Sequence, residues 1–283
     1  MNKYAPDLSS QFRDKVIVVT GSTQGSGAET AKLLAHRGAK GVTICGRKEK
    51  EGLSVKEEIE KIGSQCIFVK ADLSKEKDCR NIVESTDKTF GRVDCLINVA
   101  GFTERGTILS TTIDNYDMCF NVNTKAPFIL MQDSIRIMIR ENIKGSIVNV
   151  LSMAMHSGMP FLAAYSASKA ALANMTKNTA NAVAGHNIRV NALNIGWTDT
   201  PGEDAIQKKF HDGGEDWLEK AESKVPFKRL TKAIDVARAA AYFCSEESGL
   251  VTGSIIDYDQ TVLGWHAYSA YDTNILGDSL LGE

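Results

Sequence analysis

The chain has 283 residues, 24% of them charged, and its formal net charge is −2. This length suits one sizeable α/β domain, and charges of both signs are interspersed, so no basic surface for nucleic acid is expected. No apolar run approaches the ~20 residues of a membrane-spanning helix. Six scattered cysteines and five dispersed histidines form neither a disulfide framework nor a metal-binding pattern. These features predict a cytoplasmic protein with no metal, nucleic-acid partner or membrane contact.

The first predicted elements are a strand, a glycine-rich turn and a helix. The run from Val16 to Val19 is apolar and β-branched, as expected of a parallel strand that is buried on both faces. A helix is predicted directly after the turn, over 25–38. In this arrangement a helix N-terminus and backbone N–H groups receive a pyrophosphate. We therefore predict dinucleotide binding by the turn residues Gly21, Ser22, Thr23, Gln24, Gly25, Ser26 and Gly27.

Short apolar runs alternate with longer amphipathic runs along the rest of the chain. This alternation predicts a doubly wound, Rossmann-like α/β fold, a parallel sheet of about seven strands with helices on both faces. We interpret residues 1–283 as a single dinucleotide-binding and catalytic domain with a polar lid at about 198–224 and a C-terminal extension at about 261–283. Strands are predicted at 15–20, 42–45, 66–70, 93–98, 146–151, 188–194 and 254–258, and further helices at 49–62, 76–90, 114–141, 163–184 and 232–244.

Several small or polar residues follow directly after predicted strands. Ligands of doubly wound sheets bind at the carboxyl ends of the strands, so these residues are expected to gather at one edge. Such convergence indicates a ligand site more strongly than any single motif does. The residues, in chain order, are Gly46, Arg47, Asp72, Leu73, Asn98, Ala100, Gly101, Ser152, Gly196 and Thr198.

Tyr165 and Lys169 lie four residues apart on a predicted helix, so their side chains share one face. A free tyrosine has a pKa near ~10, and a nearby cation favours the phenolate and lowers that value. Taken alone, the pair also fits an ordinary exposed helix surface. Together with Ser152 at the end of the preceding strand, it predicts a device for proton exchange with an alcohol or a carbonyl.

Residues 13–260 resemble a short-chain dehydrogenase/reductase of the single-domain type. The family's Thr-Gly-x-x-x-Gly-x-Gly is present at 20–27, and its Asn-Asn-Ala-Gly is matched by 98–101, with Val99 in place of the second Asn. Ser152 and the Tyr-x-x-x-Lys of Tyr165 complete the pattern. The family's helix asparagine is best matched by Asn123, although Asn121 is close. Asp-Gln-Thr at 259–261 stands where the family has Asp-Gly-Gly.

The resemblance implies hydride transfer between a nicotinamide and a secondary alcohol or ketone. Tyr165 would exchange the proton, and Lys169 would lower its pKa and bind the nicotinamide ribose. Ser152 would hold the substrate oxygen, and Asn123 would position a water that connects the lysine to solvent. Asp72 would contact adenine. The resemblance also implies a homo-oligomer, either a tetramer or a dimer.

NADP is expected more than NAD as the cofactor. An acid at the end of the second strand would accept the ribose 2′-hydroxyl of NAD, whereas here Arg47 could pair with the 2′-phosphate of NADP. Against NADP, Gln24 occupies a position where NADP-using family members often carry Arg or Lys. Arg47 and Lys48 also fit ordinary solvated charges at the start of a helix.

The substrate is expected to be a small polar molecule such as a polyol, a sugar or a sugar acid. The charged segment 198–224 predicts a polar, mobile lid, which suits a hydroxylated substrate. His156 is a candidate for binding a substrate hydroxyl beside Ser152 and Tyr165. The nearby methionines 153, 155 and 159 would line the pocket, or else fill gaps in the core. The aromatic residues at 265, 266, 268 and 271 would either close the pocket or cover a subunit interface, and the interface is favoured.

Two alternatives remain open from the sequence. A 3-oxoacyl-thioester reductase would share this active site, and a basic patch for an acyl-carrier protein would favour it. A nucleotide-sensing protein without turnover would share the fold. The presence of both Tyr165 and Lys169 argues against the second alternative. Fold by itself does not decide the substrate.

Overall fold

A seven-stranded parallel sheet forms the centre of the protein in a computed structural model, which describes residues 7–211 and 213–262. The strand order is β3-β2-β1-β4-β5-β6-β9, and every neighbouring pair is parallel. The predicted doubly wound α/β fold is confirmed, and each predicted strand is present. The strands are β1 (Val16–Val19), β2 (Gly41–Gly46), β3 (Gln65–Lys70), β4 (Cys95–Asn98), β5 (Ser146–Ser152), β6 (Arg189–Ile195) and β9 (Ile255–Tyr258).

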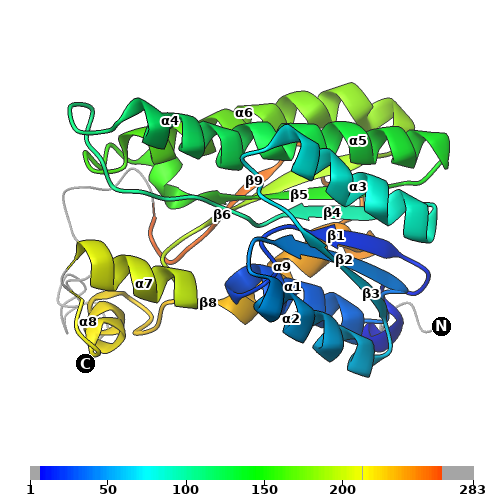
Figure 1. Ribbon diagram of the computed structural model, residues 1–283, viewed down its shortest axis with the longest axis horizontal. Helices are drawn as coiled ribbons and strands as arrows, with labels where there is room; N and C mark the ends of the chain where they lie inside the picture. Colours follow the sequence, from blue (N-terminus) through cyan, green and yellow to red (C-terminus); the bar gives the residue numbers. More distant parts are fainter. Residues whose placement is uncertain (1–6, 212, 263–283) are drawn as a thin grey trace, which may run out of the picture.

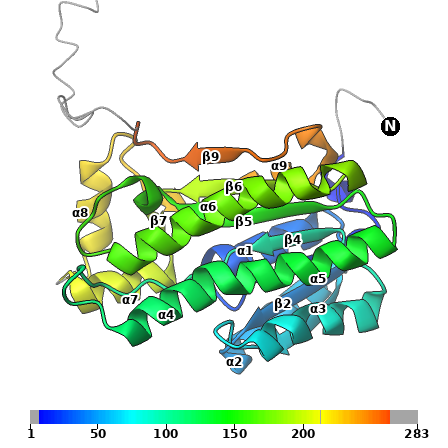
Figure 2. The ribbon, with the colours of Figure 1, turned by 90° about the horizontal axis from the view of Figure 1, so that it is seen from above.

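Helices cover both faces of the sheet (Figure 1). One layer holds α3 (Glu76–Phe90), α4 (Ile113–Phe120), α5 (Ala126–Arg140) and α6 (Ala163–Val183). The opposite layer holds α1 (Gly25–His36), α2 (Glu49–Ile62) and α9 (Ala233–Cys244). Figure 2 shows the remaining helices, α7 (Pro201–Phe210) and α8 (Trp217–Lys224), at one end of the sheet. A two-stranded parallel ribbon of β7 (Thr198–Asp199) and β8 (Thr231–Lys232) lies in the same region.

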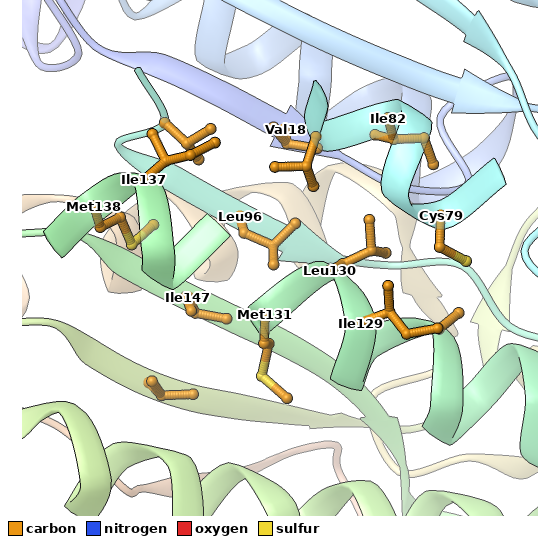
Figure 3. Close-up of a cluster of buried hydrophobic side chains, with 14 of the residues drawn as sticks. Val18, Cys79, Ile82, Leu96, Ile129, Leu130, Met131, Ile137, Met138 and Ile147 are labelled. Atoms are coloured by element: carbon orange, nitrogen blue, oxygen red, sulfur yellow. The ribbon is translucent and has the colours of Figure 1, made fainter. Parts of the chain in front are cut away.

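Two apolar cores lie on the two faces of the sheet. All four residues of β1 are completely buried, because helices cover both of its faces. Val18 and Leu96 point into the core beneath α3 and α5, where they meet Ile82 and Leu130 (Figure 3). Ile17 and Val19, the alternate residues of β1, join the core beneath α1 and α9. This alternation is the period of two that a strand imposes on its side chains.

The chain leaves β1 toward β2 on one side and returns to β4 on the other side. Crossover connections in opposite directions leave a crevice between two strands at their carboxyl ends, and ligands of such sheets bind there. No helix within the described ranges is both long enough and apolar enough to cross a membrane.

Candidate active site

A cavity of about 870 Å³ opens at the carboxyl ends of the strands. Its walls come from the turn after β1, the ends of β2 and β3, the loop after β4, the end of β5, and α7. Most of the residues predicted to gather at this edge do so. Those that line the cavity are Gly21, Thr23, Gln24, Gly25, Ser26, Gly27, Gly46, Arg47, Asp72, Leu73, Ala100, Gly101, Ser152, Tyr165, Gly196 and Thr198.

The glycine-rich turn has the shape that a pyrophosphate requires. Gly21 adopts a φ of +63°, and a Cβ at this position would lie 2.8 Å from the Cα of Ala100. A Cβ on Gly27 would collide with the carbonyl oxygen of Gly21, so only glycine lets the helix start this close to the turn. The N-cap residue of α1, Gln24, makes no side-chain capping bond within the described residues. First-turn N–H groups without a side-chain acceptor suit an anionic ligand, so the site fits a dinucleotide.

Three predicted cofactor residues do not line the cavity: Ser22, Asn98 and Lys169. The hydroxyl of Ser22 donates to the carbonyl of Val19 (2.6 Å) and accepts from the amide of Cys45 (2.9 Å). The amide of Asn98 donates to the side chain of Asn149 (2.8 Å) on the neighbouring strand. The side chains of Ser22 and Asn98 brace the edge of the sheet below the cavity, and contact of these residues with the cofactor stays a prediction.

Two cations lie at the end of β2, the position expected to contact the ribose 2′-hydroxyl of NAD or the 2′-phosphate of NADP. Arg47 and Lys48 both line the cavity. The Nζ of Lys48 donates to Oε1 of Gln24 at 3.0 Å. A cation therefore lies beside Gln24, the position where NADP-using family members often carry Arg or Lys. The carboxylate of Asp72, at the end of β3, accepts bonds from the amide and hydroxyl of Ser74 (3.1 and 2.8 Å).

Tyr165 and Lys169 lie on the first turns of α6. The lysine is 3% exposed, and its Nζ donates to the carbonyl oxygen of Val150 at 2.8 Å. That Nζ lies 5.9 Å from the centre of the tyrosine ring. Burial lowers the pKa of Lys169 to about 8. Burial also raises the pKa of Tyr165, against the opposing effect of the Ser152 hydroxyl. The expected lowering of the tyrosine pKa by the lysine is therefore not found in the protein alone, because burial penalises both charged forms.

Ser152 ends β5 and begins the 3₁₀ turn Met153–His156. Its Oγ accepts a hydrogen bond from the amide of Ala154 at 3.2 Å, which fixes the position of the oxygen. Because this contact uses only an acceptor site, the hydroxyl proton can be donated to another oxygen. Ser152 and Tyr165 line the same cavity, and the Ser152 hydroxyl is near enough to act on the pKa of Tyr165.

Asn123 is completely buried within a π-helical turn, Asn121–Lys125, which divides the helix predicted over 114–141. Its Oδ1 accepts from the amide of Phe102 (2.8 Å), and its Nδ2 donates to the carbonyl of Phe102 and to Ser168 (2.9 Å each). A Cβ on Gly101 would lie 3.6 Å from the Nζ of Lys169 and 3.8 Å from this Oδ1. The amide therefore ties the loop after β4 to α6 beside the lysine, and the role of Asn123 in positioning a water stays a prediction.

His156 does not line the cavity. Its Nε2 lies 3.0 Å from Oδ1 of Asp257 on β9, and this oxygen also accepts from the amide of Asn194 (2.7 Å). The described geometry pairs His156 with β9, and its binding of a substrate hydroxyl stays a prediction. Among the methionines, 153 and 159 line the cavity, whereas Met155 packs against the apolar core.

The segment over the cavity has more apolar packing than its composition suggests. Trp217 is buried against Ala221 and Leu230, which form a small apolar cluster of their own. The indole of Trp217 also donates to Asp204 at 2.7 Å, linking α8 to α7. The segment 198–224 therefore has apolar contacts that hold it in place, although many of its residues are charged. The extension at 261–283, with its aromatic residues, lies outside the described residues from position 263 on.

Gln260 occupies the place where the family has glycine. Its Oε1 accepts from the amide of Phe227 and its Nε2 donates to the carbonyl of Arg229, both at 2.8 Å. These bonds fasten the segment after α8 to the end of the sheet.

Polar residues that the sequence did not single out also face the cavity. Arg105 lines it from the loop after β4. Three further residues, Glu203, Gln207 and His211, line it from α7 and the residue that follows this helix. They are spaced four residues apart, which places them on one helical face. This spacing within the polar segment 198–224 was the signal that could have identified them.

Comparison with known proteins places this site in a broad group of oxidoreductases. A family model described as Enoyl-(Acyl carrier protein) reductase matches residues 21–262. An uncharacterized oxidoreductase of Thermotoga maritima is 38% identical over 248 residues, covering 88% of this chain and 97% of its own. The 3-oxoacyl-(acyl-carrier-protein) reductase of the same organism is 34% identical, with 88% and 98% covered. A glucose 1-dehydrogenase of Gluconobacter oxydans is 29% identical, with 93% and 96% covered.

Solved structures show the same arrangement of strands and helices. A Sinorhizobium meliloti protein, provisionally called a short-chain alcohol dehydrogenase, superposes with a TM-score of 0.80 at 30% identity. The match covers 89% of this chain and 97% of that one.

Proposed function

Because the chain belongs to the short-chain dehydrogenase/reductase family of NAD(P)-dependent oxidoreductases, we propose that it oxidises or reduces a small polar secondary alcohol or ketone, such as a polyol, a sugar or a sugar acid. The polar face of α7 carries this proposal. Glu203 and Gln207 line the cavity that also contains Tyr165 and Ser152. Gln207 and Trp197 both donate to Oε1 of Glu203, but the second carboxylate oxygen makes no side-chain hydrogen bond within the described residues. An apolar substrate would cover this oxygen without pairing it, which costs binding free energy.

In this proposal Tyr165 gives a proton to the substrate oxygen during reduction and takes it back during oxidation. Ser152 donates a hydrogen bond to the same oxygen and stabilises the charge that develops on it. The ammonium of Lys169 stabilises the phenolate, and Asn123 keeps the neighbouring loop in place. A bound nicotinamide supplies or accepts the hydride.

A matched substrate screen tests this function. Purified protein would be assayed with NAD and NADP against polyols and sugar acids, and in the reverse direction against ketones of equal size with and without hydroxyl groups. We expect the hydroxylated members of each pair to have the higher kcat/KM. Better turnover of the apolar ketones would contradict the polar-substrate proposal.

A 3-oxoacyl-thioester reductase is the second candidate, because the T. maritima relative of that name is 34% identical. Apolar residues also line the cavity, among them Phe102, Met118 and Val122. Acetoacetyl-coenzyme A therefore belongs in the same screen. Its reduction at a higher kcat/KM than any sugar-derived substrate would favour this candidate over the polar one.

For the cofactor, we propose NADP, supported by the two cations at the end of β2. Replacing Arg47 with alanine should weaken NADP binding by about 10- to 100-fold, the usual worth of a charge-assisted contact, and leave NAD binding nearly unchanged. Fluorescence titration of both reduced cofactors measures this. Tighter binding of NAD than of NADP by the unmodified protein would overturn the proposal.

Two details sharpen the cofactor experiment. Lys50→Ala is the matched control, because it removes an exposed cation from the first turn of α2, three residues from Arg47.

An acid placed at Gly46 would be a poorer test, since its Cβ would lie 2.6 Å from Cγ2 of Thr23. A loss of affinity there would reflect crowding as well as charge.

We also propose that the protein acts as a homo-oligomer. Large apolar side chains are exposed on α5, at Phe128 and Ile139, and on the edge strand β9, at Ile256. Exposed apolar surface on regular elements is typical of contacts between subunits.

A further inference from the structure

Arg105 is an arginine inside the cavity that the proposed chemistry does not use. Its Nη1 donates to Oγ1 of Thr103 at 2.9 Å, and its Nε donates to Nε2 of His211 at 3.1 Å. The guanidinium carbon lies 5.7 Å from the centre of the Phe161 ring. That ring also meets the imidazole of His211 edge-on, at 5.9 Å between centres. Contacts from two hydrogen-bond acceptors and an aromatic ring hold the guanidinium in one orientation.

The positive charge of Arg105 is not neutralised by an acid of the described chain. The neighbouring carboxylate, Glu104, pairs instead with Lys209 at 3.0 Å. No ion pair of Arg105 occurs within residues 7–211 and 213–262, whereas arginines 80, 92 and 140 each pair with aspartate. A guanidinium has five N–H donors, and the two observed bonds use two of them. The remaining three are sufficient for a two-pronged contact with an anion.

Arg105 shares the reaction space with Tyr165. Both residues line the same cavity. Burial dominates the pKa of the tyrosine, but the Arg105 charge acts to lower it and the Glu203 charge acts to raise it. A substrate whose oxygen lies at Tyr165 can therefore reach a cation on one wall and a carboxylate on another.

Glu203 complements this arrangement from α7. Its Oε1 accepts bonds from the indole of Trp197 (2.8 Å) and the amide of Gln207 (2.6 Å). These contacts fix the carboxylate while its second oxygen can accept from a substrate hydroxyl. Glu203 would repel a phosphate dianion more strongly than a carboxylate, because the repulsion grows with the charge of the ligand.

We propose that Arg105, positioned by Thr103 and His211, binds the carboxylate of the substrate, so that the enzyme acts on small hydroxy acids or oxo acids. This inference rests on the proposed function and narrows its substrate class. A planar guanidinium matches a carboxylate in shape, which adds selectivity over a neutral alcohol of equal size.

The test compares acids with the polyols that differ from them only at one carbon. The probes are D-gluconate with D-glucitol, D-galactonate with D-galactitol, and D-xylonate with xylitol. We expect the unmodified enzyme to prefer the acid in at least one pair. Arg105→Met should raise KM for that acid by about 10- to 100-fold, with a smaller change in kcat and little change for the polyol. Arg105→Lys should recover only part of the loss, because an ammonium cannot form the two-pronged contact.

Two controls separate this effect from damage to the lid. Lys220→Met removes another cation of the same segment, one that pairs with Asp216 and does not line the cavity, and it should leave the preference for the acid intact. Binding is also measured without turnover, by titrating the acid into Tyr165→Phe protein that carries reduced cofactor. Addition of Arg105→Met to this variant should weaken acid binding by the same factor.

The possible results distinguish the two proposals. Turnover of polyols and acids alike, unchanged in Arg105→Met, would overturn the role of Arg105 and leave the proposed function standing. A preference for D-glucitol 6-phosphate over gluconate that Arg105→Met abolishes would assign the cation to phosphate and overturn the carboxylate inference. Failure of the unmodified enzyme to turn over or bind any acid, polyol or sugar phosphate would overturn the proposed function itself.

Discussion

Replacing Tyr165 with phenylalanine should reduce turnover by about 10²- to 10⁴-fold, the usual contribution of a positioned acid or base. The substitution removes only the hydroxyl that exchanges a proton with the substrate oxygen. The ring remains in the wall of the cavity, so thermal unfolding and cofactor affinity should stay close to those of the unmodified protein. Steady-state kinetics and cofactor titration measure the two effects separately.

Tyr242→Phe is the matched control for this experiment. Tyr242 is 43% exposed on α9, on the other face of the sheet from α6, so loss of its hydroxyl should leave turnover unchanged. Retention of a tenth of the original rate by Tyr165→Phe would remove the tyrosine from the proton-transfer step.

Replacing Lys169 with methionine should also suppress turnover strongly and move the activity toward higher pH. In the proposed mechanism the ammonium stabilises the phenolate when cofactor and substrate are bound. Its loss should therefore raise the pKa of Tyr165, which burial already holds above the usual tyrosine value. The rate of alcohol oxidation should then rise with pH at a higher midpoint than in the unmodified enzyme. In the unmodified enzyme this midpoint belongs to the coupled tyrosine–lysine pair rather than to either group alone. An unchanged pH profile in the variant would contradict the role of Lys169.

The same substitution should change how stability depends on pH. Lys169 has a pKa of about 8 in the folded protein, below the ordinary lysine value of 10.5. Between these values the unfolded chain binds the extra proton, so the free energy of unfolding rises with pH across this window. Relative to Lys169→Met, the unmodified protein should gain about 3 kcal/mol between pH 7 and pH 11. Urea unfolding at both pH values measures the difference, and Lys177→Met, at an exposed position of α6, should show no such gain.

Local sequence patterns were sufficient to predict the scaffold and much of the cavity. The buried run of β1 and the alternation of strands and helices depend on side-chain periodicity, which neighbouring residues determine. The glycine-rich turn was recognisable from the spacing of its glycines. This spacing is required because a Cβ on Gly27 would collide with the carbonyl of Gly21. Residues that follow strands were predicted to gather at one edge because all parallel strands end there.

Tertiary structure alone decided what several of those residues contact. His156 is four residues from Ser152 in the chain, yet its ring meets Asp257, 101 residues away. The lid looked unsupported by composition, but a single buried tryptophan, Trp217, holds its two helices together. Arg105 is held in the cavity by a hydrogen bond to His211, which lies 106 positions later in the chain. Periodicity specifies which face of an element is buried, whereas the partner of a polar side chain depends on long-range packing, and no local pattern encodes that.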